Sequence, residues 1–330
     1  MDFVLLWVDG SDEAWLREKM KYKPDESTPD KAAADAAKCF RDWGTLKYWF
    51  RGVETCAPWV RKIHFVTWGH LPPWLNIEHP KLHIVNHRDF MPEGSLPTFN
   101  SQALEMNLHR IPDLAGHFVY FNDDTFLIGR VRVRDFFEGG LPRDCALMTP
   151  VFPERFGTGT VQINNMEIVN AYFGGISAVF RNKSKWFAPC YGPHLFRTLL
   201  LLPFRRMCGF YEPHLPNAFL KSTFETVWEK EADVLLKTSR SRFRQKDNVN
   251  QWLMRYWQLM SGNFAPRNPK IGQFFDLSGD MDAIERVIKK RGCRMLCLND
   301  SDAIADMEAR KERLLRLFEE LFPKKSDYER

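Results

Sequence analysis

The chain has 330 residues, of which 44% are hydrophobic and 14% aromatic, so it holds enough apolar material for one large domain or two small ones. Lys and Arg outnumber Asp and Glu by 47 to 42, and this excess is spread along the chain. A diffuse basic excess favours anionic ligands over duplex nucleic acid. There is no leader-like N-terminus and no apolar run near the ~18 residues that cross a bilayer, so we expect a soluble protein.

Short apolar runs that stop at polar turns recur through the first half of the chain, and such runs are typical of fully buried strands. They lie at residues 3–8, 63–67, 82–85 and 118–121. Apolar residues at helical spacing lie between them, at 43–53 and at 104–111, the latter after the candidate N-caps Asn100 and Ser101. This alternation predicts an α/β fold with a mostly parallel sheet. Ligands of such sheets bind beyond the carboxyl ends of the strands.

The pattern predicts a single domain over residues 1–330, with an α/β half at 1–150 and an irregular helical half at 151–330. The stretch 19–39 contains two prolines and many charges, which indicates a mobile surface insert. In the second half, helical patterns lie at 219–228 and 249–260. Near 303–322 the apolar residues fall on one helix face that Pro323 ends, as in a helix docked against the main body.

Asn122, Asp123 and Asp124 follow the run at 118–121 directly, so a buried strand would deliver an amide and two carboxylates to one loop. Hard oxygen ligands suit Mg²⁺ or Mn²⁺, and an ion held in this way typically bridges the phosphates of a nucleotide. The alternative for an isolated triplet is a polar turn that caps the next segment.

Four blocks of sequence, in order, carry a family resemblance. They are DFVLLWVDGSD at Asp2; the long stretch from FRDWGTLKYWFRGVE at Phe40 to HFVYFNDDTFL; GFYEPHLPNAFLKS at Gly209 with SRSRFRQKDNVNQW at Ser239; and CLND at Cys297. Together they resemble the Stealth family of sugar-1-phosphate transferases. That family includes bacterial capsular-polysaccharide phosphotransferases and the animal enzyme that adds N-acetylglucosamine-1-phosphate to lysosomal glycoproteins.

The resemblance implies a catalytic domain whose Rossmann-like or GT-A-like core binds a nucleotide-sugar. It also implies a role for each matching residue. Four residues would hold Mg²⁺ or Mn²⁺ or support its ligands: Asp123, Asp124, Asn299 and Asp300. Five would contact the UDP-sugar donor: Asp9, Gly10, Ser11, Asn100 and Ser101. An ordinary strand-ending turn and an ordinary helix cap are the structural alternatives for these two donor-contacting groups.

Five further residues would carry the reaction by the same resemblance: His214, Arg244, Asp247, Arg41 and Asp42. His214 would take a proton from the attacking hydroxyl. Arg41 would grip phosphate while Asp42 orients it, although a surface ion pair is the alternative for these two. Arg244 would stabilise charge on the transferring phosphoryl group.

Two departures from the family pattern bear on donor or acceptor specificity rather than on reaction type. Trp68, Gly69 and His70 stand where members often read Asn-Gly-Gln. Asn217 stands where some members carry a second histidine.

The resemblance implies transfer of a sugar-1-phosphate from a UDP-sugar to a hydroxyl of a glycan acceptor, with release of UMP. The setting would be capsular or cell-surface polysaccharide synthesis in the bacterial cytoplasm or at the inner face of the plasma membrane, with no nucleic-acid partner. A metal-dependent glycosyltransferase that releases UDP is the alternative, because a metal-binding acidic pair after a strand would serve it equally well. A glycan-binding module without catalysis is a third hypothesis.

A smaller hypothesis concerns residues 197–206, RTLLLLPFRR. A short apolar run flanked by arginines can rest on an anionic membrane that displays a lipid-linked acceptor. A buried helix is the alternative that the pattern favours.

Overall fold

The computed structural model describes residues 1–23, 40–153, 157–301, 304 and 306–330. Most of the insert expected at 19–39 lies outside these residues. Its first residues, 19–22, belong instead to helix α1 (Glu13–Tyr22), whose N-cap Asp12 accepts a hydrogen bond from the backbone N–H of Trp15. No helix in the described ranges combines the length and the apolar character needed to cross a membrane.

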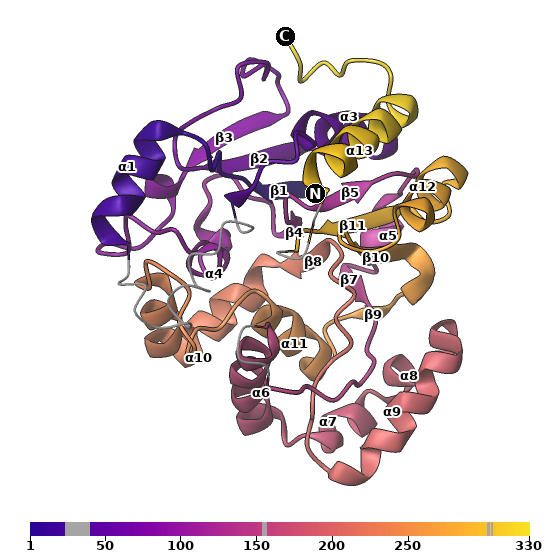
Figure 1. The fold of residues 1–330 in the computed structure, drawn as a ribbon. Helices are drawn as coiled ribbons and strands as arrows, with labels where there is room; N and C mark the ends of the chain where they lie inside the picture. Colours follow the sequence, from indigo (N-terminus) through magenta and orange to yellow (C-terminus); the bar gives the residue numbers. More distant parts are fainter. Residues whose placement is uncertain (24–39, 154–156, 302–303, 305) are drawn as a thin grey trace.

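The central sheet has the strand order β3–β2–β1–β4–β8 (Figure 1). Its strands are β1 (Asp2–Leu6), β2 (Lys62–Thr67), β3 (Leu82–Asn86), β4 (His117–Phe121) and β8 (Asn217–Leu220). The first four run parallel, while β8 pairs antiparallel with β4. The predicted α/β fold with a mostly parallel sheet is therefore confirmed.

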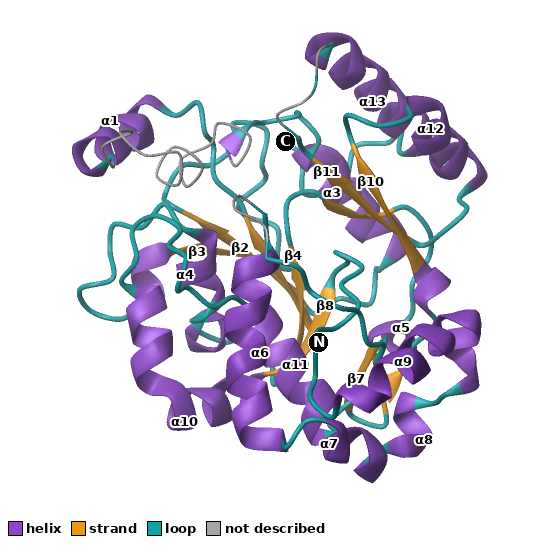
Figure 2. Cartoon of the chain, turned by 60° about the horizontal axis from the view of Figure 1, so that its bottom comes forward, coloured by secondary structure: helices purple, strands orange, loops and turns teal. Residues whose placement is uncertain are grey.

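Both faces of this sheet are buried, because successive side chains of a strand point to opposite faces. Phe3 and Leu5 of β1 belong to one hydrophobic core, and Val4 and Leu6 belong to the other. The first core is covered by helices α3 (Leu46–Cys56) and α13 (Met307–Leu321). The second is covered by helices α4 (Ser101–Glu105), α6 (Gly159–Phe173), α10 (Lys221–Ser239) and α11 (Trp252–Ser261), of which α6, α10 and α11 stand together in Figure 2.

Two smaller sheets also lie within the described part of the chain. One has the order β10–β11–β5, formed by β10 (Gly272–Asp276), β11 (Met295–Asn299) and β5 (Thr125–Leu127). The other has the order β6–β7–β9, formed by β6 (Phe137–Glu138), β7 (Leu141–Asp144) and β9 (Ala265–Pro266). The second half of the chain thus contributes strands that its irregular pattern does not predict. Within the described residues the other helices are α5 (Val133–Phe136), α7 (Ile176–Arg181), α8 (Lys183–Trp186), α9 (Leu195–Leu201) and α12 (Met281–Lys290). The same part of the chain has the 3-10 turns η2 (His87–Asp89), η3 (Leu108–Arg110), η4 (Pro189–His194), η5 (Leu202–Phe204) and η6 (Pro269–Ile271).

Two predicted helices differ from the structure. The helix expected through residue 111 stops after Glu105, and the chain continues as the 3-10 turn η3. The helical pattern expected at 219–228 begins two residues too early, because Phe219 lies in β8 and α10 starts at Lys221. The pairing of β8 with β4 overrides the local spacing in the second case.

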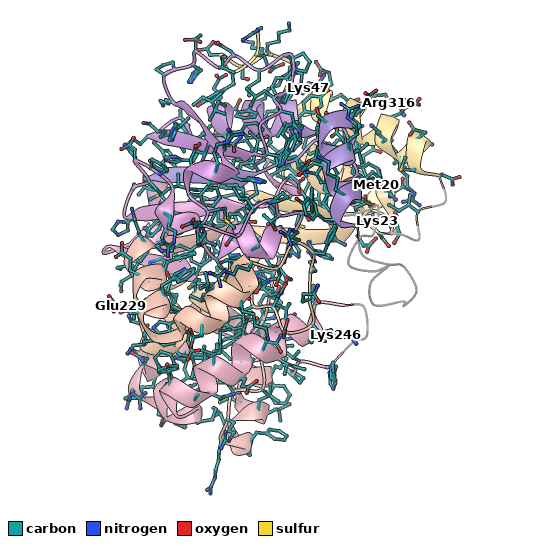
Figure 3. All side chains as sticks on the ribbon, turned by 90° about the vertical axis from the view of Figure 1, so that its left-hand side faces the viewer. Met20, Lys23, Lys47, Glu229, Lys246 and Arg316 are labelled. Carbon is teal, nitrogen blue, oxygen red and sulfur yellow. The ribbon has the colours of Figure 1, made fainter. Side chains whose placement is uncertain are left out.

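The C-terminal helix docks as predicted, although α13 begins at Met307 rather than near residue 303. Phe318 is fully buried and packs against Tyr48 of α3 and Phe126 of β5, with ring centroids 5.6 Å and 4.9 Å away. Arg316 of the same helix is exposed and lies at the surface (Figure 3). The helix therefore joins the last segment of the chain to the first core.

Candidate active site

A cavity of about 700 Å³ opens at the carboxyl ends of β1 and β4. This is the point where the strand order reverses, since β2 lies on one side of β1 and β4 on the other, and open α/β sheets bind ligands there. The predicted site residues that line the cavity are Arg41, Asp42, Asn100, Ser101, Asp123, Asp124, His214, Arg244, Asn299 and Asp300. Segments far apart in the sequence therefore meet at one place.

The carboxylate pair follows β4 directly, as predicted. The backbone carbonyl of Asp124 accepts a hydrogen bond of 2.9 Å from the N–H of Leu298, which ties this loop to the end of β11. Burial, and then the neighbouring Asp124, raise the pKa of Asp123 to about 7. Burial likewise raises the pKa of Asp124. The Asp123 side chain is exposed to the cavity and that of Asp124 is partly exposed, and two adjacent carboxylates repel each other unless a proton or a cation offsets their charge.

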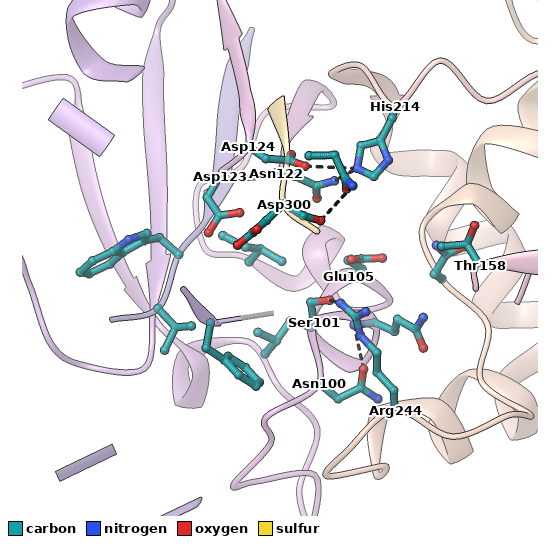
Figure 4. A pocket seen from close by; sticks show the side chains of 18 of the residues that line it. Asn100, Ser101, Glu105, Asn122, Asp123, Asp124, Thr158, His214, Arg244 and Asp300 are labelled. Carbon is teal, nitrogen blue, oxygen red and sulfur yellow. Dashed lines mark hydrogen bonds and ion pairs between the residues drawn. The ribbon is translucent and has the colours of Figure 1, made fainter. Parts of the chain in front are cut away.

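His214 approaches the same pair from the loop before β8 (Figure 4). Its Nε2 lies 3.2 Å from Nδ2 of Asn122 and 3.6 Å from Oδ2 of Asp124. Its backbone has a φ of 49°, which is uncommon for a residue other than glycine. Such backbone conformations cluster at functional sites, where the surrounding structure must hold them.

A buried ion network supports the loop before β8 that carries His214. Arg255 of α11 is 1% exposed, and its guanidinium lies 2.6 Å from Asp144 and 2.9 Å from Glu212. Burial raises the pKa of Glu212, and the charge of Arg255 opposes this rise. Because Glu212 precedes His214 by two residues, the network fixes where the loop enters the cavity.

The donor atoms around Asp124 suit a divalent cation. Its Oδ1 is buried and has no hydrogen-bond partner among the described residues, which leaves an oxygen for a ligand. Asp123, Asp124 and Asn299 offer the hard oxygens expected for Mg²⁺ or Mn²⁺.

The structure also brings Cys297 to this point, which was not expected as a site residue. Ligand atoms of Asp124, His214 and Cys297 lie within 4.8 Å of one another. Burial raises the pKa of Cys297 well above its usual range, so its neutral thiol donates toward Oδ2 of Asp124, 3.5 Å away. Sulfur is a soft ligand, whereas Mg²⁺ and Mn²⁺ prefer oxygen, and this favours the oxygen set.

The expectation that Asp42 orients Arg41 is wrong. Nη1 of Arg41 lies 3.0 Å from Oδ1 of Asp300, whereas the Asp42 carboxylate accepts from the backbone N–H of Gly44. The indole N–H of Trp43 donates to the second oxygen of Asp300, at 3.0 Å. Both oxygens of Asp300 therefore have donors, and the structure presents Asp300 as the residue that positions Arg41. Each carboxylate oxygen has more than one lone pair, so these contacts leave the predicted role of Asp300 at the metal site open.

Arg244 and Ser101 meet on the opposite wall, where the guanidinium donates to the Ser101 hydroxyl at 3.2 Å (Figure 4). Asn100 is confirmed as the N-cap of α4, since its side chain accepts from the N–H of Gln102. Its Nδ2 also donates to Oδ1 of Asn248 at 2.9 Å. This bond ties the start of α4 to the loop that carries Arg244.

Four predicted residues lie outside the cavity lining in the described structure. Asp9 and Ser11 form a local turn, in which the Ser11 N–H donates to the Asp9 carboxylate at 2.8 Å. A Cβ on Gly10 would come within 2.0 Å of the Phe40 carbonyl oxygen, so close backbone packing accounts for this glycine. Asp247 pairs with Lys237 at 2.6 Å on the surface. Donor contact by the turn and catalysis by Asp247 stay predictions.

His70, part of the first departure from the family pattern, supports this turn. Its Nε2 accepts a hydrogen bond of 2.7 Å from the backbone N–H of Asp9. The second departure, Asn217, donates from Nδ2 to Oε1 of Gln251 at 3.3 Å. His70 therefore contacts a turn outside the cavity lining, whereas Asn217 contacts Gln251, which lines the cavity.

Sequence reasoning missed two buried polar groups beside the predicted residues. Glu105 lines the cavity, accepts from the Gln251 N–H at 3.2 Å, and has its pKa raised by burial. Its place four residues after Ser101, on the same helical face, is the signal that could have found it. Cys297 carries no comparable signal, because only the pairing of β11 with β5 brings it to Asp124.

A mostly parallel sheet presents a carboxylate pair, a histidine and two arginines around one cavity, an arrangement suited to the transfer of phosphoryl or glycosyl groups. The chain belongs to the Stealth family. Models of the family's conserved regions 1, 2 and 4 match residues 1–27, 39–143 and 285–330. These ranges contain the first, second and fourth of the sequence blocks described above.

Curated relatives extend over the whole chain. The capsular polysaccharide phosphotransferase WcwK of Streptococcus pneumoniae is 41% identical over 330 residues, which is all of this chain and 98% of the relative. The receptor polysaccharide phosphotransferase WefC of Streptococcus oralis is 42% identical over all of this chain and 99% of its own length. The exopolysaccharide phosphotransferase cps2G of Lactiplantibacillus plantarum is 39% identical, covering 100% and 96%. The protein is accordingly an enzyme of the phosphotransferase class.

Among solved structures, the galactosyltransferase LgtC, in complex with donor and acceptor sugar analogues, aligns over 97% of this chain and 96% of its own. The sequence identity is 10% and the TM-score is 0.43, too low for an argument about function.

Proposed function

We propose that this enzyme transfers a sugar-1-phosphate from a UDP-sugar to a hydroxyl of a glycan acceptor, with release of UMP, in the synthesis of a capsular or other cell-surface polysaccharide. The observation that supports it most is the meeting of His214, the Asp123–Asp124 pair, Arg41 and Arg244 around one cavity. Membership of the Stealth family and the names of the relatives agree with phosphoryl transfer.

The bond changes follow from this assignment. The acceptor oxygen attacks the β-phosphorus of the donor, and a new P–O bond forms as the bond to the bridging oxygen of UMP breaks. The proton of the hydroxyl passes to His214, whose Nε2 lies at the edge of the acidic pair. UMP leaves with the bridging oxygen, and the product is a sugar–phosphate–sugar diester. The anomeric C–O bond stays intact, so the sugar keeps its configuration.

The two arginines suit charge stabilisation during this displacement. Asp300 and Trp43 hold Arg41 from one wall, and Ser101 contacts Arg244 on the other. Guanidinium groups bind phosphate oxygens in a planar, two-point geometry, so preorganised arginines stabilise the transition state without reorganisation. A divalent cation held by Asp123 and Asp124 would offset the charge of the diphosphate.

The first test asks which nucleotide the reaction releases. The purified protein is supplied with a panel of UDP-sugars, Mg²⁺ or Mn²⁺ and candidate oligosaccharide acceptors, and acceptor-dependent UMP and UDP are quantified. We expect UMP, abolished by a chelator and lowered at least 100-fold by Asp123→Ala. Release of UDP instead would identify a glycosyltransferase and overturn the proposal.

A matched variant controls for loss of an acidic residue as such. Asp233 of α10 is exposed and lies outside the cavity, so Asp233→Ala should keep the wild-type rate. Glycan binding without nucleotide release from any donor would indicate a binding module. That result would contradict catalysis.

A further inference from the structure

Residues 174–206 form a lobe of short helices, α7 to α9, with the 3-10 turns η4 and η5 (Figure 1). We call residues 174–206 the basic lobe. Buried side chains fix it to the second core, since Ile176 and Val179 of α7, Trp186 and Tyr191 are all less than 9% exposed. The lobe is therefore an ordered part of the fold with a defined outer surface.

The charged residues in and around the basic lobe are all basic. Residues 168–211 contain no Asp or Glu, yet they include six Lys or Arg residues. Four of these cations are exposed: Arg181, Lys183, Arg205 and Arg206. Elsewhere the two signs are mixed, as in the ion pairs of α12 and α13. A surface of this kind attracts a polyanion or an anionic lipid surface.

Large apolar side chains are exposed on the same lobe. Phe196, Leu199 and Leu200 of α9 are 67%, 51% and 58% exposed. Phe180 is 53% exposed and Phe204 is 68% exposed. The buried helix that the sequence pattern favours at 197–206 is therefore wrong, because most of its apolar side chains face outward. Phe196, Leu199 and Leu200 are three and four residues apart on α9, so they share one helix face, and exposed apolar groups gathered in this way mark an interaction surface.

We propose that the basic lobe docks on an anionic membrane surface, with its exposed phenylalanine and leucine side chains entering the interface and its arginines and lysines contacting lipid phosphates. The pairing of apolar groups with same-sign cations and no acid is the composition of interfacial helices. A second copy of the chain would bring like charges together, which disfavours self-association through this surface. An anionic bilayer satisfies both the apolar and the charged groups.

The position of the basic lobe relative to the cavity gives membrane docking a functional consequence. Thr160 and Val161, at the start of α6, line the cavity, and α6 ends at Phe173, just before the lobe. A helix of 15 residues spans ~22 Å, so the lobe and the cavity lie about one helix length apart along α6. Docking would hold the cavity near an acceptor displayed on a lipid, a consequence that rests on the proposed function. The proposal that the basic lobe docks on a membrane does not rest on that function.

Co-sedimentation with vesicles tests the proposal without any measurement of activity. The full chain is mixed with vesicles of phosphatidylcholine alone or with 30% phosphatidylglycerol added, at ~0.1 M and ~0.5 M salt. We expect binding to the anionic vesicles that weakens at the higher salt, where the Debye length is shorter. Phe196→Ser with Phe204→Ser, and separately Arg205→Glu with Arg206→Glu, should each weaken binding roughly tenfold or more.

The control is Phe152→Ser, since Phe152 is 70% exposed but lies outside the lobe. It should bind as the wild type does. The proposal is overturned if the wild type stays in the supernatant with anionic vesicles, or if the Phe196 and Phe204 variant sediments like the wild type. A wild-type dimer that this variant dissociates, seen by analytical ultracentrifugation without vesicle binding, would assign the surface to a second copy.

Discussion

At the scale of single residues, His214 combines a strained backbone with a central position. A left-handed conformation costs a residue with a Cβ about 1–2 kcal/mol, which the surrounding contacts must offset. Trp252 and Phe274 enclose its ring, with centroids 6.3 Å and 5.8 Å away. The fold thus tolerates an unfavourable backbone conformation at His214, and this conformation places the imidazole against Asn122 and Asp124.

Replacing this imidazole tests its predicted role as the base. His214→Gln should lower kcat by about 10²- to 10⁴-fold, because the hydroxyl loses its proton acceptor while the fold is kept. Rates of UMP release and circular dichroism spectra measure the two effects. Asp233→Asn is the comparison, since Asp233 of α10 is exposed and lies outside the cavity, and we expect it to stay within about twofold of the wild type. A His214 variant with the wild-type kcat would move the base to another residue.

His109 makes stability depend on pH. Burial, and then Arg110, lower its pKa to about 3, so the folded protein keeps the ring neutral. The unfolded chain binds a proton below a pH of about 6.5. The contribution of His109 is therefore complete above pH 6.5 and is lost as the pH falls toward 3. Between pH 7.5 and 5 the loss is about 2 kcal/mol.

Urea unfolding at these two pH values measures the effect. The ring packs against Phe224 and Trp228, and its Nδ1 is buried without a partner among the described residues. His109→Phe should therefore flatten the pH dependence of the free energy of unfolding. An unchanged slope would mean that His109 has the same pKa in the folded and the unfolded protein.

At the scale of elements, the antiparallel strand β8 carries the second half of the site. Its register pairs Asn217 with Tyr120, so the loop before β8 arrives where β4 ends. Arg255 then fixes this loop through Glu212. The position of His214 thus depends on one strand pairing and one buried ion network.

Removing the cation of that network should destabilise the protein. Arg255→Met leaves Asp144 and Glu212 buried without their partner, and we expect a loss of about 3–5 kcal/mol in the free energy of unfolding. The activity of the remaining folded protein should also fall, because the His214 loop loses its support. Arg286→Met, at an exposed position of α12, should change the free energy by less than about 0.5 kcal/mol. A loss below about 1 kcal/mol for Arg255→Met would mean that the network adds little.

The elements that the sequence predicts best are those whose local pattern agrees with their packing. The four parallel strands are continuous apolar runs because both sheet faces are buried, and the acidic pair is visible because it ends one of these runs. The sequence pattern predicts a helix over residues 219–228 because Phe219 and Phe224 both enter the second core. Phe219 belongs to a strand only because β8 pairs with β4. Nothing local could show that Asp300, 259 positions away, holds Arg41.

At the scale of the whole molecule, the two hydrophobic cores share the central sheet. Alternate residues of β1 and β4 enter one core or the other, so neither core can open without exposing these strands. We expect one cooperative thermal transition, seen together by calorimetry, tryptophan fluorescence and loss of activity.

Phe318→Ala removes a fully buried ring from the first core and should lower the free energy of unfolding by about 3–5 kcal/mol, shifting that single transition. The exposed neighbour Arg316 supplies the control, since Arg316→Ala should leave the transition almost unmoved. Two separate transitions in either protein would divide the chain into independent units.

The pairing of β4 with β8 has a consequence for how the chain can be divided. The acidic pair belongs to the first half of the sequence and the histidine to the second, and backbone hydrogen bonds between β4 and β8 join them. The first half alone would present β4 as an open, apolar edge, which invites association with other chains. A chain cleaved near residue 150 would therefore regain its reaction centre only when the two fragments associate by pairing β4 with β8.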